Sequence, residues 1–120
     1  DLPEPGGPEA KNGTFAAIRQ KDGSTVITCA SGNRMVIFDK DGKVEWHLTT
    51  DEVDGQLNDV CGLQVLKSGN FLVSCYGNQT PDGLKMMEIT RDKKVVWTYQ
   101  NPDARFVHNV HVLSTNGVAE

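Results

Sequence analysis

Short apolar runs recur along the chain, and polar residues, glycine or proline bound each of them. The runs are rich in Val, Ile, Phe, Thr, Met and Trp, which suit the pleated and half-buried surface of a sheet. No stretch places apolar residues at the 3.6-residue spacing of an amphipathic helix, so we expect no long helix. The pattern predicts strands near 13–19, 24–30, 34–39, 43–48, 61–67, 70–76, 84–90, 94–99 and 107–113.

Two pairs of segments repeat each other. Gly23-Ser-Thr-Val-Ile-Thr-Cys29 matches Gly69-Asn-Phe-Leu-Val-Ser-Cys75, with Gly on Gly and Cys on Cys. Met35-Val-Ile-Phe-Asp-Lys-Asp-Gly-Lys-Val-Glu-Trp46 matches Met86-Met-Glu-Ile-Thr-Arg-Asp-Lys-Lys-Val-Val-Trp97, and each reads as a strand, a tight turn and a strand ending in Trp. The second pair lies further apart than the first because of an insertion around Asn78-Gln-Thr-Pro-Asp82, where Pro and Asp-Gly indicate a longer loop. Trp46 and Trp97 are expected to pack between adjacent sheets.

A third element occurs three times, as Phe15-Ala-Ala-Ile18, Leu63-Gln-Val-Leu66 and Val110-His-Val-Leu113, and each copy is followed by a polar turn that closes on Gly. A period in the high forties, built from short strands and turns, is the mark of a β-propeller blade. The sequence therefore predicts an all-β propeller fragment with two four-stranded antiparallel blades and the first strand of a third. The expected parts are a Pro- and Gly-rich lead-in over 1–12, blade one with its exit loop over 13–60, blade two with its exit loop over 61–106, and the further strand in 107–120.

Composition narrows the classes of function. Hydrophobic residues make up 38% of the chain and charged residues 23%, which is a globular balance. The net charge is −4 with both signs interspersed, which argues against nucleic acid as a partner. No apolar run approaches the roughly 18 residues that span a bilayer, so no membrane span is expected. Two blades leave apolar faces bare, so the expected partners are the remaining blades of a longer chain or other copies of the protein.

The three cysteines are expected to be structural. Cys29 and Cys75 occupy equivalent positions on interior strands and read as small buried hydrophobes. Cys61 opens a first strand near the predicted channel, where a redox role is the less favoured alternative. An odd count cannot pair fully within one chain, and no CxxC or Cys/His metal spacing is present.

The motif Ile37-Phe-Asp-Lys-Asp-Gly-Lys-Val-Glu-Trp46 resembles the repeat of PQQ-like (quinoprotein-type) β-propellers, and its second copy has Lys93 in place of the Gly. Asn58-Asp-Val with Leu66-Lys-Ser-Gly-Asn-Phe-Leu72 is similar to PQQ-like and arylsulfotransferase-like propellers of bacterial exported proteins, and His108-Asn-Val with Leu113-Ser-Thr-Asn-Gly117 echoes it. The resemblance covers about 13–117. It implies a periplasmic or secreted location, or the cell surface, and it makes PQQ or calcium conceivable without supporting either as a cofactor.

Ligands of propellers usually sit at one mouth of the central channel, and long polar loops on a rigid scaffold are where binding concentrates. The loops expected there are 49–60, 100–106, 30–33 and 77–83. Their candidate ligand-binding residues are Asp51, Asp54, Asn58, Asp59, Asn101, Asp103 and Arg105, together with His108 at the start of the next inner strand. Carboxylates of the first loop could bind calcium, but Asp51-Glu-Val-Asp-Gly-Gln56 lacks the alternating spacing of a calcium loop. We expect a solvated acidic loop and assign no metal ligands.

His108 is the one candidate for catalysis, as a channel acid or base or a substrate contact, against the alternative of an interior structural histidine. His108 and His111 lie three apart on a predicted strand, where they point to opposite faces and cannot share one metal. No phosphate loop, nucleophile elbow or Ser/His/Asp pattern appears. We therefore expect a non-catalytic scaffold that binds a protein, glycan or small molecule. The alternative is a portion of a propeller enzyme of quinoprotein or arylsulfotransferase type with its active site at the channel mouth.

Overall fold

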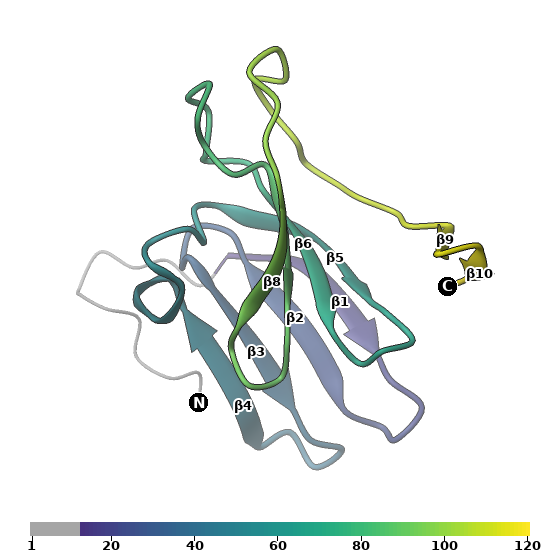
Figure 1. Ribbon diagram of the computed structural model, residues 1–120. Coiled ribbons are helices and arrows are strands. Elements are labelled where there is room, and N and C mark those ends of the chain that lie inside the picture. Colours follow the sequence, from purple (N-terminus) through teal and green to yellow (C-terminus); the bar gives the residue numbers. More distant parts are fainter. Residues whose placement is uncertain (1–12) are drawn as a thin grey trace.

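The computed structural model describes residues 13–120 (Figure 1). The predicted lead-in 1–12 lies outside the described residues. The first four strands are β1 (Thr14–Arg19), β2 (Thr25–Cys29), β3 (Arg34–Phe38) and β4 (Val44–Thr49). A single 3-10 turn, η1 (Thr50–Val53), leads to β5 (Val60–Val65), β6 (Phe71–Cys75), β7 (Met86–Ile89) and β8 (Val95–Tyr99). The two short strands β9 (Ser114–Thr115) and β10 (Val118–Ala119) come last.

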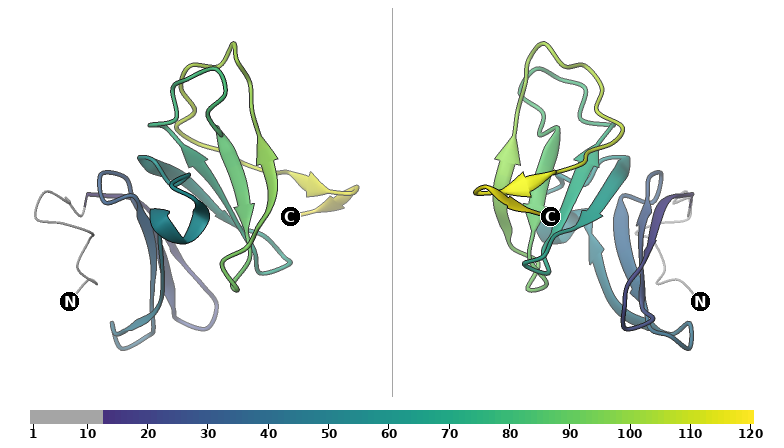
Figure 2. Two further views of the ribbon diagram at one scale, coloured as in Figure 1. Left: turned by 60° about the vertical axis from the view of Figure 1, so that its left-hand side comes forward. Right: turned by 90° about the vertical axis from the view of Figure 1, so that its right-hand side faces the viewer.

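The strands form two antiparallel meanders, as the sequence predicts. The first sheet has the order β1-β2-β3-β4 and the second has the order β5-β6-β7-β8. All eight strands lie within two residues of the expected bounds at either end. Figure 2 shows the two sheets standing face to face. Among the described residues, no helix is long and apolar enough to cross a membrane.

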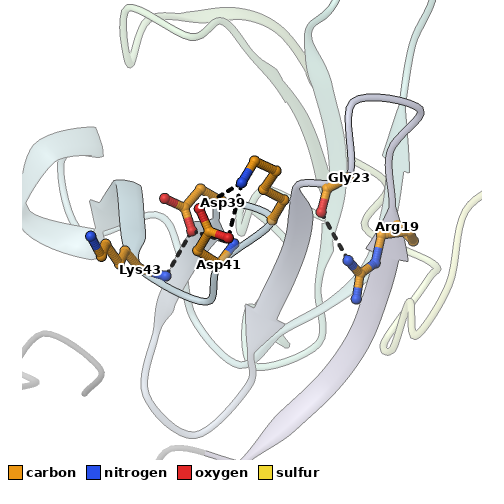
Figure 3. A network of polar contacts seen from close by, with 6 residues as sticks. Arg19, Gly23, Asp39, Asp41 and Lys43 are labelled. Carbon is orange, nitrogen blue, oxygen red and sulfur yellow. Dashed lines mark hydrogen bonds and ion pairs between the residues drawn. The ribbon is translucent and has the colours of Figure 1, made fainter.

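Tight turns with local hydrogen bonds close the hairpins at one end of both sheets. In the β3–β4 turn, the Asp39 side chain accepts hydrogen bonds from the backbone N–H of Asp41 (2.9 Å) and of Lys43 (2.8 Å), as Figure 3 shows. In the β1–β2 turn, Arg19 donates to the carbonyl of Gly23 (2.9 Å), which lies in the same view. Gly23 has a φ of +87°, which a residue with a side chain rarely adopts. These Asp, Lys and Gly positions are the turn signals that the sequence carries.

The main core lies between the two sheets. Trp46 of β4 packs on Phe71 of β6, with ring centroids 5.3 Å apart, and its indole N–H donates to the carbonyl of Arg91 (2.9 Å). The Arg91 guanidinium in turn lies 5.0 Å from the centre of the Phe71 ring. Beside this cluster, the Thr28 hydroxyl donates to the carbonyl of Cys61 (2.7 Å). The predicted role of Trp46 between sheets is confirmed.

Trp97 differs from Trp46, although the repeat makes them equivalent. It is 45% exposed on β8, so the prediction that it packs between sheets is wrong for residues 13–120. The physical reason is that the face of the second sheet carrying Trp97 has no further four-stranded sheet against it among the described residues.

The predicted strand near 107–113 is also not formed. These residues belong to no sheet, because a strand is defined by ladder hydrogen bonds and none of the described strands pairs with them. They run as an extended segment that ends in the small β9–β10 hairpin (Figure 1).

The register of the inner strands corrects one sequence match. Ile18 pairs with Val26, and Gln64 pairs with Leu72. Since Val26 and Leu72 are repeat equivalents, the structural counterpart of Ile18 is Gln64, two residues before the match drawn from sequence. A bulge near the start of each inner strand, at Thr14/Ala16 and at Val60/Leu63, disturbs the simple alternation of the first strands.

Candidate ligand-binding site at the loop face

The long loops gather at one end of the molecule, opposite the tight turns. The Asn33 side chain accepts from the backbone N–H of Asp59 (2.8 Å), which ties the β2–β3 loop to the β4–β5 loop. The Asn78 side chain donates to the carbonyl of Gln56 (3.0 Å), which ties in the β6–β7 loop. Gln100 donates to the carbonyl of Asp82 (2.6 Å), which brings in the segment after β8. The four loops expected at one mouth therefore form one surface, which we call the loop face.

The polar candidates of the β4–β5 loop mainly shape that loop. Asp51 and Asp54 are exposed, and Asp54 caps η1 in the left-handed conformation, with a φ of +53°. Asn58 is half-buried, and its side chain lies so close to Gly77 that a Cβ there would meet Asn58 Oδ1 at 2.5 Å. The carbonyl of Asp59 accepts from the Tyr76 N–H (3.1 Å). Asn58 and Asp59 therefore anchor the loop to the end of β6, while Asp51 and Asp54 face solvent.

Glu52, which the sequence analysis did not single out, stabilises the same loop. It accepts a hydrogen bond from the backbone N–H of Thr49 (3.0 Å) and forms an ion pair with Lys93 (2.5 Å). The hydrogen bond from Lys93, followed by that from Thr49, lowers the pKa of Glu52 below its ordinary value. This carboxylate joins η1 to the second sheet.

Asn101 and Asp103 form a turn after β8. The Asn101 side chain accepts from the Asp103 N–H (2.9 Å) and donates to the Tyr99 hydroxyl (3.1 Å). Asp103 is exposed. Arg105 is also exposed, and its guanidinium lies 5.1 Å from the centre of the Phe106 ring. Arg105 therefore lies beside an aromatic side chain, whereas Asn101 orders the turn.

Four rings make a stack on the loop face, which we call the aromatic ladder (Phe15, Tyr76, Phe106 and His108). Tyr76 and His108 are stacked with centroids 4.1 Å apart and planes within 3° of each other. Phe106 lies 5.0 Å from Tyr76 at 21°, and Phe15 lies 6.1 Å from His108 at 13°. Phe15 is 50% exposed and Phe106 44% exposed, and His108 is exposed as well. Three residues of the ladder, Phe15, Phe106 and His108, are thus exposed to solvent on a surface held by two sheets.

The backbone explains how residues so far apart in sequence meet. Phe15 lies in the bulge of β1, and bulges re-aim a side chain away from the regular alternation of a strand. Tyr76 directly follows β6, and its N–H is held by the carbonyl of Asp59. His108 lies in the extended segment after β8, whose close packing at Asn109 leaves no room for a Cβ on Gly62 (2.7 Å). Three separate elements therefore position the ladder.

A buried cation supports the loop next to the ladder. Lys85 is 1% exposed, and its ammonium donates to the carbonyls of Asn78 and Thr80 (2.8 Å for Thr80). The Asn78 side chain also donates to the carbonyl of Leu84 (2.8 Å). These bonds satisfy backbone carbonyls that the β6–β7 loop would otherwise leave unpaired. The loop is therefore held in place by its own polar contacts.

The cysteines behave as buried hydrophobes, as expected. Burial raises the pKa of Cys75 to about 12, and it raises the pKa of Cys29 as well. Cys61 is 3% exposed, and its pKa is raised first by burial and then by the charge of Asp59. A protonated thiol is a poor nucleophile, so the chemistry of Cys61 favours the structural role over the redox alternative.

Over residues 13–120, no three His, Cys, Asp or Glu side chains come together in a way that could hold a metal ion. The carboxylates of the β4–β5 loop have different contacts: Asp54 caps η1, and Glu52 forms an ion pair with Lys93. His108 lies against the ring of Tyr76.

Sequence reasoning found two parts of this surface, Arg105 and His108, and missed Phe15, Tyr76 and Phe106. The signal for the missing three was present: each is an aromatic residue within two positions of the loop end of a predicted strand. Aromatic residues at strand ends are also common in sheet cores, so this signal alone does not separate a surface ring from a buried one.

Comparisons with known proteins bear on the fold. No protein-family model and no curated protein sequence matches the chain. Solved structures do match. A protein of unknown function from Bacteroides caccae aligns with a TM-score of 0.67 at 16% identity, over 80% of this chain and 38% of that one. The chain has a β-propeller fold. Its two sheets are two blades, blade one (β1–β4) and blade two (β5–β8).

Two further structures give the same result. A streptogramin B lyase aligns with a TM-score of 0.59 at 15% identity, over 78% of this chain and 28% of that one. A catalytically inactive virginiamycin B lyase from Staphylococcus aureus, with quinupristin, aligns with a TM-score of 0.57 at 18% identity, over 82% and 30%. The chain thus spans between about a quarter and two fifths of the propellers it resembles. At this identity the likeness concerns the fold alone.

Proposed function

We propose that the protein is a non-catalytic β-propeller module that binds its ligand on the loop face, against the aromatic ladder. The observation that carries the proposal is the parallel stack of His108 on Tyr76, with exposed Phe15 and Phe106 at its sides. Exposed rings that are ordered by neighbours, on a rigid scaffold, are typical of binding surfaces.

The ladder favours a ligand with a flat apolar face. An aromatic ring, or the face of a sugar ring, can stack on exposed rings, and each well-oriented aromatic pair adds about 0.5–1.5 kcal/mol beyond the area it buries. Arg105 next to Phe106 and the backbone-anchored Asp59 next to Tyr76 supply polar groups at the rim. Aromatic centre and polar rim together match the composition of ligand-binding surfaces.

The PQQ-like repeat type and an exported location belong to the same proposal. They are supported by the turn motifs that end in Trp46 and Trp97 and by their resemblance to exported propellers. Neither PQQ nor calcium is part of the proposed function.

The test compares two histidine variants. Saturation-transfer NMR of the complete protein is run with 4-nitrophenyl glycosides and with a Trp-containing tripeptide as probes. We expect at least one probe to bind, and His108→Ala to weaken that binding about 10-fold, the equivalent of about 1.4 kcal/mol. His47→Ala, at an exposed histidine of β4 away from the ladder, should leave binding unchanged. Equal binding by both variants would place the site elsewhere.

A second candidate function is a propeller enzyme with His108 as acid or base at the channel mouth, of quinoprotein, arylsulfotransferase or lyase type. It is favoured by the exposure of His108 on the loop face and by the two lyases among the similar structures. Incubation with quinupristin, followed by mass spectrometry, tests the lyase version. Conversion by the wild type and loss of conversion in His108→Ala would replace the binding proposal with this one.

A further inference from the structure

Two tight turns of the same kind lie side by side at the end of the molecule opposite the loop face (Figure 1). In the β1–β2 turn the N–H of Gln20 donates to the carbonyl of Ser24 (2.9 Å), and in the β5–β6 turn the N–H of Leu66 donates to the carbonyl of Asn70 (2.9 Å). A Gly of positive φ stands at the same place in each turn. Blade one and blade two therefore present equivalent, internally hydrogen-bonded turns to the space between them.

A pocket of about 520 Å³ lies between these turns, and we call it the turn pocket. It is lined by residues 18–22 of blade one and mainly by residues 65–67 of blade two. Its volume is in the range of pockets that take small organic ligands. Ile18 and Val65 are half-buried against the core between the sheets, and Leu66 is buried. These three side chains make one part of the lining apolar.

The other part of the lining is cationic. Arg19, Lys21 and Lys67 line the turn pocket, and all three are exposed. The Arg19 guanidinium has five N–H donors and uses one of them on the carbonyl of Gly23 (2.9 Å), which holds it against the turn (Figure 3). The Lys67 ammonium has three donors, of which one goes to the carbonyl of Ala119. Over residues 13–120 neither side chain forms an ion pair, so both keep donors for an anion.

Asp22 is the one carboxylate in this lining, and the turn already uses it. Its side chain accepts hydrogen bonds from the hydroxyl of Ser24 (2.7 Å) and from the Ser24 N–H (2.8 Å). The bond from the hydroxyl, followed by that from the N–H, lowers the pKa of Asp22 below its ordinary value. A fourth cation, Arg91, is held at the edge of the pocket by a hydrogen bond to the Gln20 side chain (3.4 Å). Asp22 therefore orders the turn without neutralising the cations around it.

The excess of positive charge at the turn pocket is a local feature of an acidic protein. The only other carboxylate bonded to a lining residue in the described part of the chain is Glu120, which accepts from the Lys67 N–H (2.7 Å). Four cations thus stand with two carboxylates here, although the chain has a net charge of −4. A concave site with mainly one sign of charge concentrates ions of the opposite sign. The turn pocket therefore favours an anion.

Arg19 also departs from the pattern of the repeat. It pairs with Thr25 across the sheet, and the equivalent pair of blade two is Val65 with Phe71. An arginine thus stands where blade two carries a β-branched apolar residue, the type that suits this position of a strand. The sheet itself gives no reason for this arginine, whereas an anion in the turn pocket does.

We propose that the turn pocket binds a small organic anion with an apolar chain, of which a medium-chain carboxylate is the simplest form. The carboxylate accepts hydrogen bonds from Arg19 and the two lysines, because the guanidinium fork matches the two oxygens of a carboxylate. The chain of the ligand lies along Ile18, Val65 and Leu66, which removes apolar surface from water. The turn pocket and the aromatic ladder lie at opposite ends of the sheets, so this is a second site, independent of the first.

The test compares three probes on the complete protein by methyl ¹H–¹³C NMR. Octanoate has both the charge and the chain, octanamide has the chain alone, and inorganic phosphate has the charge alone. We expect octanoate to bind at least about 10-fold more tightly than either of the others, and less tightly as the salt concentration rises. The largest shifts should fall on the methyl groups of Ile18, Val65 and Leu66. The methyl groups of Leu72, which does not line the turn pocket, should stay unchanged.

A pair of variants with the same change of charge tests the role of Arg19. Arg19→Gln should weaken octanoate binding about 10-fold, through loss of the charge-assisted hydrogen bonds. Lys43→Gln should leave binding unchanged. Lys43 is an exposed cation of the β3–β4 turn that does not line the pocket, and Figure 3 shows it well apart from Arg19. If Arg19→Gln fails to fold, Lys67→Gln gives the same comparison with Lys43→Gln.

Three results would overturn the proposal. The first is octanoate binding that is no tighter than the binding of octanamide or of phosphate. The second is a set of octanoate-induced shifts on the rings of the aromatic ladder with none on the methyl groups of the turn pocket. The third is an equal loss of binding in Arg19→Gln and Lys43→Gln, which would reduce the effect to the overall charge of the protein. None of these results uses the probes of the aromatic ladder, so failure here is distinct from failure of the proposed function.

Discussion

Truncating the two equivalent tryptophans provides a matched pair of perturbations within one chain. Trp46 and Trp97 occupy the same place in their sheets, at the end of the same row of ladder partners. Trp46 contacts Phe71 and bonds to the Arg91 carbonyl, whereas Trp97 has the Tyr99 ring 6.3 Å away and is 45% exposed. Replacement of each by Ala therefore removes the same side chain from two different environments.

The structure sets the expected magnitudes. Replacing a buried Trp by Ala costs about 3–5 kcal/mol, and Trp46 is partly buried, so we expect about 3 kcal/mol for Trp46→Ala, its hydrogen bond included. Trp97 loses only its lateral contacts on the exposed face of the second sheet, so we expect about 1 kcal/mol for Trp97→Ala. At roughly 4 °C per kcal/mol for a chain of this size, the melting temperatures should fall by about 12 °C and about 4 °C.

Urea denaturation followed by far-UV circular dichroism measures both costs in the 120-residue chain. The m-values should stay unchanged, because neither substitution alters which surface unfolding exposes. The reasoning is refuted if Trp97→Ala destabilises this chain as much as Trp46→Ala does. Equal costs would mean that the two faces are equally packed and that the core between the blades is not what holds them together.

Three further predictions concern Gly62, the three cysteines and Glu52. Gly62→Ala should cost about 2 kcal/mol by overpacking and should expose the segment around Asn109 to limited proteolysis, because the new Cβ would lie 2.7 Å from Asn109 Cα. None of the three thiols of the native protein should react with Ellman's reagent at pH 8, because burial raises the pKa of Cys75 to about 12 and also raises the pKa of Cys29 and of Cys61. All three thiols should react once the protein is unfolded in urea. Wild type should exceed Glu52→Gln in stability at neutral pH, because the folded pKa of Glu52 lies below its ordinary value of 4.5, and the difference should shrink as the pH falls below about 4.5.

Each of these three predictions would be contradicted by a specific result. An Ala at position 62 that leaves the protease pattern unchanged would show that the segment after β8 is not docked on β5. Rapid labelling of one thiol in the native state would revive the redox role considered for Cys61. A difference between wild type and Glu52→Gln that grows in acid would mean that the folded pKa of Glu52 is raised.

The strands and tight turns could be predicted because their causes are local. Alternating β-branched residues set the strands, and Asp39 with Gly42, or Gly69 before Phe71, set the turns through contacts within a few residues. Two copies of each pattern reinforced each other. The pairing of Trp46 with the second sheet also followed, because the repeat itself implies neighbouring blades.

The inner strands were less predictable for physical reasons. Ile18 and Gln64 stand at the same distance before the turn glycines Gly23 and Gly69 and pair with equivalent residues, whereas a match of apolar side chains equates Ile18 with Leu66. The segment 107–113 has the composition of a strand, yet a strand needs a hydrogen-bonded neighbour, and sequence pattern does not report whether one is present.

In the candidate site too, features with local causes could be predicted and features that depend on distant contacts could not. Arg105 and His108 could be named because polar and titratable residues in loops stand out in a sequence. The stack of His108 on Tyr76 joins two residues that are 32 positions apart along the chain, and no local pattern encodes that contact. The polar residues of the β4–β5 loop stood out for the same reason as His108, and two of the candidates there, Asn58 and Asp59, anchor the loop through backbone contacts.

The most direct test of the central claim is to map where a ligand binds. Aromatic ¹H–¹³C NMR of the complete protein is recorded during titration with the probe that binds best among the 4-nitrophenyl glycosides and the Trp-containing tripeptide. The account predicts that the largest shifts fall on the rings of His108, Tyr76 and Phe15, and that the Trp46 ring in the core between the blades stays unchanged. Shifts that cluster away from the aromatic ladder, or saturable binding with no shift of these rings, would contradict it.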